Sequence, residues 1–197
     1  MRIGIDLDNT IVCYDGLFHQ VAIRRGLIPS GLATDKQAVR DFLRNDGRND
    51  DWTQLQGLVY GEAMSEANPY VGFAQFVAAA LRHDWTVFVI SHRTRQPYLG
   101  PPHDLHAAAR AWLGSNVMLP EENVFLEVSL EDKLQRIADQ RCDVFVDDLP
   151  ELLLHPDFPS EVERVCFDPA NRCAEPGLRR VTAWSELTAL WFSGERA

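Results

Sequence analysis

The chain has 197 residues, enough for one domain or for one domain with a substantial insertion. Hydrophobic residues make up 46% and charged residues 24%, as in globular proteins that bury a hydrophobic core. The net charge is −10, which argues against binding of a nucleic-acid polymer because such binding needs clustered cations. A small anionic substrate is compatible with this charge, since one phosphate group needs only a few donors.

The cysteines are expected to be reduced thiols. No C-x-x-C pair occurs, and most of the four lie in or beside apolar runs: Cys13, Cys142, Cys166 and Cys173. The apolar runs are too short to span a bilayer, and a strand starting at Arg2 leaves no room for a signal peptide. We therefore expect a cytoplasmic protein that does not bind a membrane.

The first element is a buried strand, "RIGIDL" (2–7), that ends at two aspartates. Residues 12–69 then show helical periodicity, with apolar stripes at 17–22, 38–43 and 55–63. This region contains no convincing strand, so it predicts a helical insertion.

Three local signals mark the helix ends in this insertion. Gly26 is expected to end the first helix. Thr34 and Gln37 predict a capping box at the start of the second helix. The polar stretch 44–51 predicts a loop before the third helix.

Strands and helices alternate through the rest of the chain. We expect strands at 86–90, 123–128, 143–146 and 162–167, and helices around 73–81, 105–113, 131–140 and 184–191. Continuous apolar strands alternating with amphipathic helices predict an α/β fold, with a Rossmann-like parallel sheet flanked by helices. The ligand crevice of such a sheet lies at the carboxyl ends of its strands.

Polar residues follow the strands at that edge. The acidic pairs are Asp6 with Asp8 and Asp147 with Asp148, and Ser91 ends another strand. Two carboxylate pairs at one edge repel each other unless a cation lies between them, and oxygen ligands favour Mg²⁺. Lys133, near the start of a helix, adds a positive charge, so the set contains the parts of a phosphoryl-transfer site.

The motifs resemble those of the haloacid dehalogenase (HAD) superfamily of phosphohydrolases. "DLDNT" matches the D-x-D-x-T motif, with Asp6, Asp8 and Thr10 at its defined positions. "VFVIS" matches the second motif, a hydrophobic strand that ends in Ser or Thr. Lys133 fits the third motif, and "VFVDD" at the second acidic pair fits the fourth.

The resemblance implies a role for each matched residue. Asp6 would be the nucleophile that forms an aspartyl-phosphate, and Asp8 would be the general acid and base. Ser91 and Lys133 would bind the phosphate, and Thr10 would brace the loop after the nucleophile. The implied Mg²⁺ ligands are Asp6, Asp8 through its backbone carbonyl, Asp147 and Asp148, the last as a direct ligand or an outer-shell partner.

The segment "RTRQPYLGPP" (93–102) predicts a loop beside the site, because it is rich in Arg, Pro and Gly. We expect His92 and Arg93 to contact the phosphorylated substrate. The long loop resembles that of a HAD subgroup of bacterial hydrolases, and it is also similar to the 5′-nucleotidase branch, which has a helical cap.

The insertion resembles the C1 cap of the family, which implies a core domain of residues 1–11 and 70–197 and a cap of residues 12–69. Such caps close over the site and select the leaving group. The aromatic residues of the cap would stack on a base or sugar, or they would form the cap's own small core: Tyr14, Phe18, Trp52 and Tyr60.

We therefore predict a Mg²⁺-dependent phosphatase acting on a small phosphorylated metabolite, with a homodimer through exposed Trp191 and Phe192 also compatible with the sequence. A non-catalytic phosphate-binding or regulatory protein on the same fold is the alternative. A dehalogenase would not need Asp8 or the pair Asp147 and Asp148. A response-regulator receiver carries its acidic residues in a different order.

Overall fold

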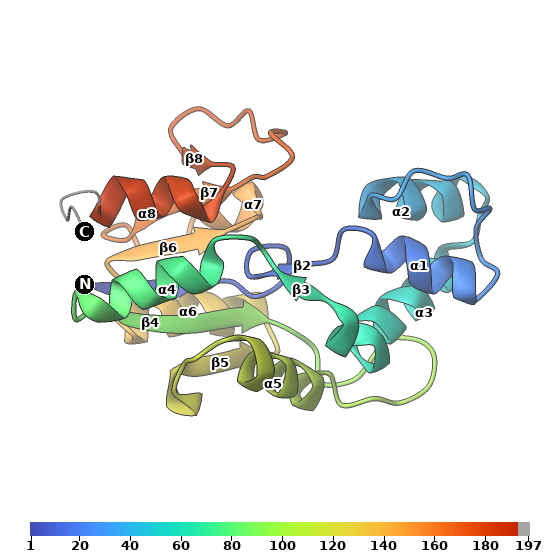
Figure 1. The fold of residues 1–197 in the computed structure, drawn as a ribbon, viewed down its shortest axis with the longest axis horizontal. Helices are drawn as coiled ribbons and strands as arrows, with labels where there is room; N and C mark the ends of the chain where they lie inside the picture. Colours follow the sequence, from blue (N-terminus) through green and yellow to red (C-terminus); the bar gives the residue numbers. More distant parts are fainter. Residues whose placement is uncertain (193–197) are drawn as a thin grey trace. The chain divides into compact units, whose positions relative to one another are not determined.

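The computed structural model describes residues 1–192, which fall into two compact units (Figure 1). The first unit consists of Met1–Val12, Pro69–His92 and the described part of Val117–Ala197. The second unit consists of Cys13–Asn68 and Arg93–Asn116. The end of the predicted core domain, residues 193–197, lies outside the described residues.

A six-stranded parallel sheet forms the centre of the first unit, which confirms the predicted α/β class. Its strand order is β5-β4-β1-β6-β7-β8. The strands are β1 (Arg2–Ile5), β4 (Thr86–His92), β5 (Val124–Glu127), β6 (Val144–Asp147), β7 (Glu163–Phe167) and β8 (Arg179–Val181). The chain first leaves and re-enters this unit at the short paired strands β2 (Val12–Cys13) and β3 (Asn68–Pro69), and it does so again after His92 and before Val117.

The central strands are apolar between their polar end residues because both faces of the sheet are covered. Val144, Phe145 and Val146 of β6 are all fully buried. Gly4 of β1 allows the close packing, because a Cβ atom at this position would lie 2.5 Å from the Phe145 ring.

Helices cover both faces of this sheet. Residues of α6 (Leu130–Asp139) and α7 (Pro150–Leu153) share a core cluster with Cys166 of β7. The next residue, Phe167, points to the opposite face, where its ring stacks on Trp184. That face is covered by α4 (Phe73–Arg82) and α8 (Trp184–Phe192), which contact each other.

The predicted exposure of Trp191 and Phe192 is wrong. Both residues are half-buried, and both rings contact Trp85 and Phe76 within the first unit. Part of their apolar surface is therefore buried within the first unit.

The second unit is helical and contains α1 (Leu17–Arg24), α2 (Lys36–Asn45), α3 (Asn49–Tyr60), the 3₁₀ turn η1 (Glu62–Glu66) and α5 (Leu105–Asn116). Helix α5, which the sequence prediction placed in the core domain, contacts α3 and η1. The loop before α5 approaches α3 at Gly57, where a Cβ atom would lie 2.7 Å from Cβ of Pro97.

The helix ends of the second unit test the local sequence signals. Gly26 follows α1 at φ 67°, and its N–H donates to the carbonyl of Ile23, which confirms the predicted helix stop. The predicted capping box is wrong: the N-cap of α2 is Asp35 rather than Thr34, and its carboxylate accepts from the N–H of Ala38 at 3.0 Å.

The predicted loop 44–51 is shorter than expected, because α2 continues to Asn45 and α3 begins at Asn49. Strand β8 was not expected from the sequence. It is a short edge strand with Arg179 and Arg180 exposed, so it lacks the apolar run of a central strand.

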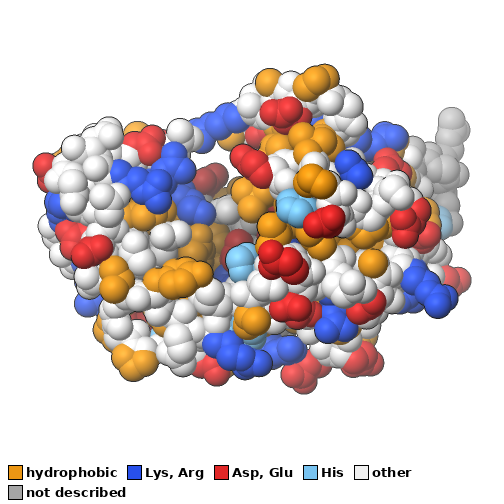
Figure 2. All heavy atoms as spheres, turned by 180° about the vertical axis from the view of Figure 1, so that it is seen from behind, with side chains coloured by type: hydrophobic (Ala, Val, Ile, Leu, Met, Phe, Trp, Pro, Cys, Tyr) orange, Lys and Arg blue, Asp and Glu red, His pale blue; other side chains and the backbone are white. Residues whose placement is uncertain are grey.

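On the face shown in Figure 2, basic side chains are interspersed with acidic ones. Among residues 1–192, no helix has the length and apolar character needed to cross a membrane.

Candidate active site

Three neighbouring strands bring the predicted site residues to one edge of the sheet. Strand β1 lies between β4 and β6, so Asp6, which directly follows β1, is flanked by Ser91 of β4 and Asp147 of β6. The chain runs from β1 through β4 to β5 on one side and then continues with β6 on the other. This reversal of strand order is where α/β sheets form ligand crevices.

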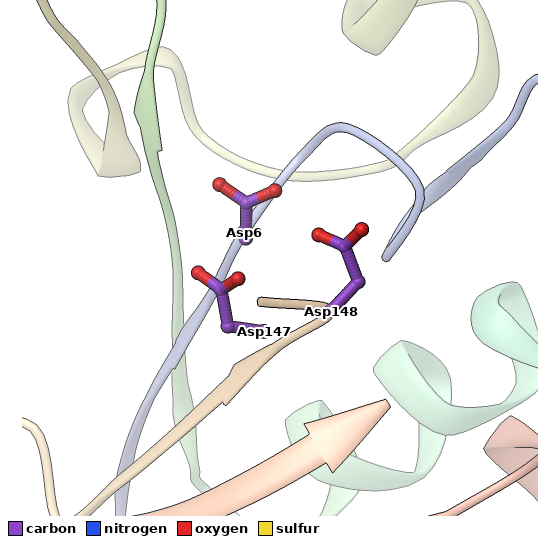
Figure 3. A group of neighbouring side chains, drawn as sticks. All are labelled: Asp6, Asp147 and Asp148. Carbon is purple, nitrogen blue, oxygen red and sulfur yellow. The ribbon is translucent and has the colours of Figure 1, made fainter. Parts of the chain in front are cut away.

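The carboxylates of Asp6, Asp147 and Asp148 converge at this edge (Figure 3). One oxygen atom from each lies within 4.8 Å of the others. Asp6 is 5% exposed and Asp147 is fully buried, whereas Asp148 is half-buried. Three acidic groups this close favour a bound cation, and their oxygen atoms suit a hard divalent ion.

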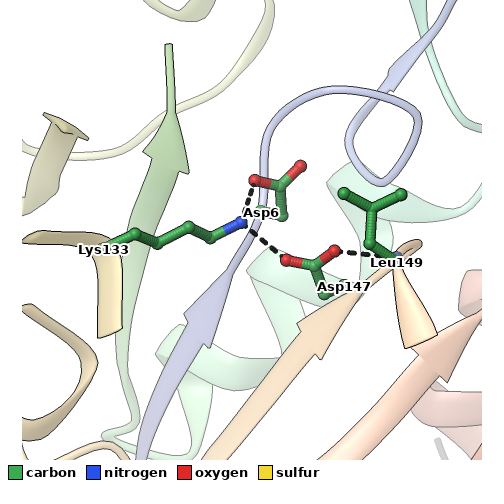
Figure 4. Close-up of polar contacts among 4 residues, drawn as sticks. All are labelled: Asp6, Lys133, Asp147 and Leu149. Carbon is green, nitrogen blue, oxygen red and sulfur yellow. Dashed lines mark hydrogen bonds and ion pairs between the residues drawn. The ribbon is translucent and has the colours of Figure 1, made fainter. Parts of the chain in front are cut away.

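Lys133 reaches the same carboxylates from helix α6 (Figure 4). Its Nζ donates to Oδ1 of Asp6 and to Oδ2 of Asp147, each at 2.7 Å, and the side chain is almost completely buried. Ser129 positions the start of the helix, because its hydroxyl accepts from the N–H of Asp132 at 3.0 Å.

The buried surroundings shift the pKa values of Asp6 and Lys133. Burial raises the pKa of Asp6 to about 7; Lys133 opposes this shift, and the charges of Asp147 and Asp8 add to it. Burial lowers the pKa of Lys133, but the carboxylates of Asp147 and Asp6 outweigh this effect, so its pKa lies above the usual value. The lysine therefore stays charged, while Asp6 binds a proton more readily than an exposed aspartate.

A tight turn follows the nucleophile candidate. The N–H groups of Ile11 and Val12 both donate to the carbonyl of Leu7, and Asn9 adopts φ 58°, which asparagine tolerates well. Asp8 is half-buried within this turn, and its carboxylate is not part of the three-carboxylate group.

The buried residue Thr10 lies at the end of this turn. Its carbonyl accepts from Nε1 of Trp184 at 3.0 Å, so helix α8 holds the turn against the sheet. Sequence reasoning missed Trp184, because a tryptophan on an apolar helix face gives no sign of a backbone partner.

Ser91 and His92 end β4 at the same edge. Ser91 is 1% exposed, and its Oγ has no hydrogen-bond partner among the described residues. Buried, unpaired hydroxyls are uncommon, and a bound ligand or an ordered water molecule would satisfy this one. His92 is exposed, and its Nε2 donates to the carbonyl of Val128 at 3.2 Å.

Asp147 is oriented by a contact that the sequence analysis missed. The backbone N–H of Leu149 donates to its Oδ1 at 2.8 Å (Figure 4). A bond from an aspartate to the N–H two residues later is an Asx-turn, and Pro150 then opens α7. The sequence "DDLP" contained this signal.

Arg93 lies in the second unit, although Ser91 and His92 belong to the first. Its guanidinium donates to the carbonyl of Tyr60 and the hydroxyl of Tyr14, each at 3.1 Å, and its carbonyl accepts from Nε2 of His106 at 2.7 Å. These contacts hold Arg93 within the second unit, and its role in phosphate binding stays a prediction.

The aromatic residues of the insertion form the core of the second unit. Tyr14, Phe18 and Trp52 are buried, and the Phe18 ring stacks on Trp52 at 5.2 Å between centroids. Tyr60 is half-buried at the margin of this cluster. The interpretation of these rings as core therefore agrees with their burial.

No protein-family model matches the chain, and no curated protein matches it in sequence. Several solved structures share its fold. A HAD family hydrolase from Deinococcus radiodurans R1, with bound phosphate and sodium, is 14% identical with a TM-score of 0.60, and the match covers 96% of this chain and 93% of that one. A HAD hydrolase from Bacillus subtilis, bound to magnesium, is 12% identical with a TM-score of 0.60, covering 96% and 97%.

A third structure, described as a dehalogenase, is 14% identical with a TM-score of 0.61, and the match covers 96% of each chain. The three matches extend over nearly the whole length of both partners, and they include the sheet that carries the acidic edge. The chain therefore has the fold of these HAD-superfamily proteins.

Proposed function

We propose that this chain is a Mg²⁺-dependent phosphatase that hydrolyses a small phosphomonoester, such as a nucleotide or a sugar phosphate, through an aspartyl-phosphate. The observation that carries this proposal is the buried Asp6, which lies beside a lysine and two further aspartates. A carboxylate held in this way is an oriented nucleophile next to positive charge.

The donor set fits Mg²⁺. Asp6, Asp147 and Asp148 carry up to three negative charges, and the one lysine beside them offsets only part of this charge. A divalent cation would relieve the remaining repulsion, and few carboxylate ligands with room for water and phosphate oxygen atoms are typical of Mg²⁺. The magnesium bound to the Bacillus subtilis hydrolase supports this assignment.

The same edge offers donors for a phosphate group. The unpaired hydroxyl of Ser91 and the ammonium of Lys133 come from neighbouring elements and would hold the phosphate oxygen atoms. His92 at the end of the same strand is proposed to contribute, and Arg93 stays a proposed substrate contact. The phosphate bound to the Deinococcus radiodurans hydrolase supports a phosphate site on this fold.

The proposed reaction has two steps. One oxygen atom of Asp6 attacks phosphorus, the bond from phosphorus to the leaving oxygen breaks, and Asp8 gives that oxygen a proton. Asp8 then takes a proton from water, which attacks the aspartyl-phosphate and releases phosphate and free Asp6. Lys133 and Ser91 orient the phosphoryl group in both steps, and bound Mg²⁺ would offset its charge.

The helical segment 12–69 is proposed to act as a C1-type cap that excludes water and selects the leaving group. A cytoplasmic location and a homodimer are further proposals. The acidic net charge supports a small phosphorylated metabolite rather than a nucleic-acid polymer as the partner.

Dehalogenation is the second candidate, because one similar structure is described as a dehalogenase. Displacement of a halide by an aspartate needs neither a second acid and base nor a cation. Asp8 and the convergence of Asp147 and Asp148 on Asp6 therefore favour the phosphatase.

Hydrolysis of p-nitrophenyl phosphate by the full chain, with Mg²⁺ and with a chelator, tests the proposal. We expect turnover that needs Mg²⁺ and that Asp6→Asn abolishes, whereas the control Asp157→Asn, at a mostly exposed residue of the same unit, keeps it. Phosphate binding without turnover of any phosphoester would support the regulatory alternative. Release of halide from a 2-haloacid without metal would support dehalogenation.

A further inference from the structure

Two cysteines of the first unit lie together near the carboxyl end of β7. Cys166 belongs to this strand and is fully buried, whereas Cys173 lies in the following loop and is half-buried. Cys173 packs against the core cluster that contains Cys166, and the nearby Cys173 thiol adds to the effect of burial in raising the pKa of Cys166.

The side chains of Arg180 and Asp168 hold the backbone of Cys173 in place. Arg180, the partner of Cys166 in the register of β7 and β8, donates from Nη1 to the carbonyl of Cys173 at 2.9 Å. The N–H of Cys173 donates to Oδ2 of Asp168 at 2.6 Å. These two contacts hold the backbone of Cys173 next to the end of β7 and to β8, the strand paired with it.

We propose that Cys166 and Cys173 are a modification site, at which a hydroperoxide converts the two thiols into a disulfide. The thiolate of Cys173 attacks the peroxide, the O–O bond breaks, and Cys173 becomes a sulfenic acid as water or an alcohol leaves. The sulfur of Cys166 then attacks that of Cys173, the S–O bond breaks, and a second water leaves. The peroxide is reduced by the two electrons that the thiol pair loses.

The order of the two steps follows from the burial of each thiol. Cys166 is fully buried, so a dissolved oxidant does not reach its sulfur directly. Cys166 is therefore a slow first nucleophile, while Cys173 in its exposed loop is open to a small oxidant. Burial also raises the pKa of Cys142 to about 12, and this buried thiol is expected to stay reduced.

The pair is close to the proposed active site, because Cys166 is the partner of Asp147 in the register of β6 and β7. A disulfide would attach the loop 168–178 to the strand beside the acidic edge. The formation of this bond does not depend on catalysis, so its test is separate from the test of the phosphatase.

The experiment uses the full chain, treated in its folded state with hydrogen peroxide. After removal of the peroxide and unfolding in guanidinium chloride, N-ethylmaleimide labels every remaining thiol, including the buried ones. Trypsin without a reductant separates the two cysteines, because Arg164, Arg172 and Arg179 are cleavage sites that yield the peptides 165–172 and 173–179. We expect these two peptides joined by a disulfide in the mass spectrum, maleimide on Cys13 and Cys142, and separation of the peptides by dithiothreitol.

Two variants complete the experiment. Cys173→Ala is expected to remove the joined peptides and to leave Cys166 labelled, whereas Cys13→Ser, which changes a half-buried cysteine outside the pair, is expected to keep them. Full labelling of all four cysteines after peroxide would overturn the proposal. So would a sulfinic acid on Cys173 with Cys166 still labelled, or a disulfide that involves Cys13 or a second chain.

Discussion

The chain contains two lysines, one in each unit, and their surroundings differ. Lys133 of the first unit is almost fully buried and contacts two carboxylates, each at 2.7 Å. Lys36 of the second unit is half-buried, donates to the Tyr60 hydroxyl at 2.9 Å and lies 5.2 Å from the centroid of the Phe18 ring.

The two lysines differ in how much their contacts contribute to folding. The aromatic partners of Lys36 are uncharged, so their attraction adds to packing at little cost. Around Lys133, buried carboxylates repel one another, and removal of the lysine leaves their charges uncompensated. Such an arrangement contributes less to folding than its short distances suggest, and it is typical of a site built for chemistry.

Replacement of each lysine by methionine gives the largest expected difference. Lys133→Met should lower the free energy of unfolding by about 3–5 kcal/mol at about pH 8 without metal, because Asp6 and Asp147 lose their cation. It should also lower kcat/KM for p-nitrophenyl phosphate by at least about 10²-fold. Lys36→Met should cost about 1 kcal/mol or less. Urea unfolding measures both costs, and equal values would contradict the comparison.

Ser91→Ala should separate activity from stability. Its buried Oγ has no partner among the described residues, so the variant loses no protein hydrogen bond and should unfold at the same or a slightly higher urea concentration. The loss of a phosphate donor should lower kcat/KM by about 10²-fold. Unchanged turnover would remove Ser91 from the proposed phosphate site.

The affinity for Mg²⁺ should rise with pH up to about 7 and then level off. The pKa of Asp6 is raised to about 7 in the folded protein without metal, so below this pH the cation must displace a proton. The dissociation constant should therefore increase about tenfold for each pH unit below about 7. Calorimetric Mg²⁺ titrations test this dependence, which Asp6→Asn should remove; a constant affinity in the wild type would contradict it.

Helix caps in the two units give the smallest expected effects. Ser129→Ala at the start of α6 and Asp35→Ala at the start of α2 should each lower the free energy of unfolding by about 1 kcal/mol. Thr34→Ala should change it by less than about 0.5 kcal/mol, because Thr34 is not the cap. Thermal unfolding of the three variants measures these losses in stability. A larger loss for Thr34→Ala than for Asp35→Ala would support the predicted capping box at Thr34.

The first unit was largely predictable from the sequence because its strands are buried on both faces. "VFVI" and "VFVD" leave no alternative to central strands, and the polar residues after them mark the edge where a ligand binds. The order of the strands then determines which of these residues become neighbours. Strand β8 escaped prediction, since an edge strand with two exposed arginines lacks this pattern.

The second unit was harder to predict, because its organisation depends on contacts between distant segments. Helix α5 has an ordinary amphipathic pattern that does not show which unit it joins. Likewise, Arg93 follows the predicted phosphate-binding strand directly, yet the partners of its guanidinium, such as Tyr14 and Tyr60, come from the helical insertion. Neither the packing of α5 nor the partners of Arg93 can be recognised from the neighbouring residues in the sequence.

The central position of β1 has a consequence for the order of folding. This strand precedes both of its neighbours in the chain, and these neighbours, β4 and β6, end at residues 92 and 147. A ribosome therefore releases most of the chain before β1 can pair on both sides, and such distant pairing is slow. The acidic groups meet only when β6 docks, so Lys133, which emerges just before Asp147, is in place to screen their repulsion at that step.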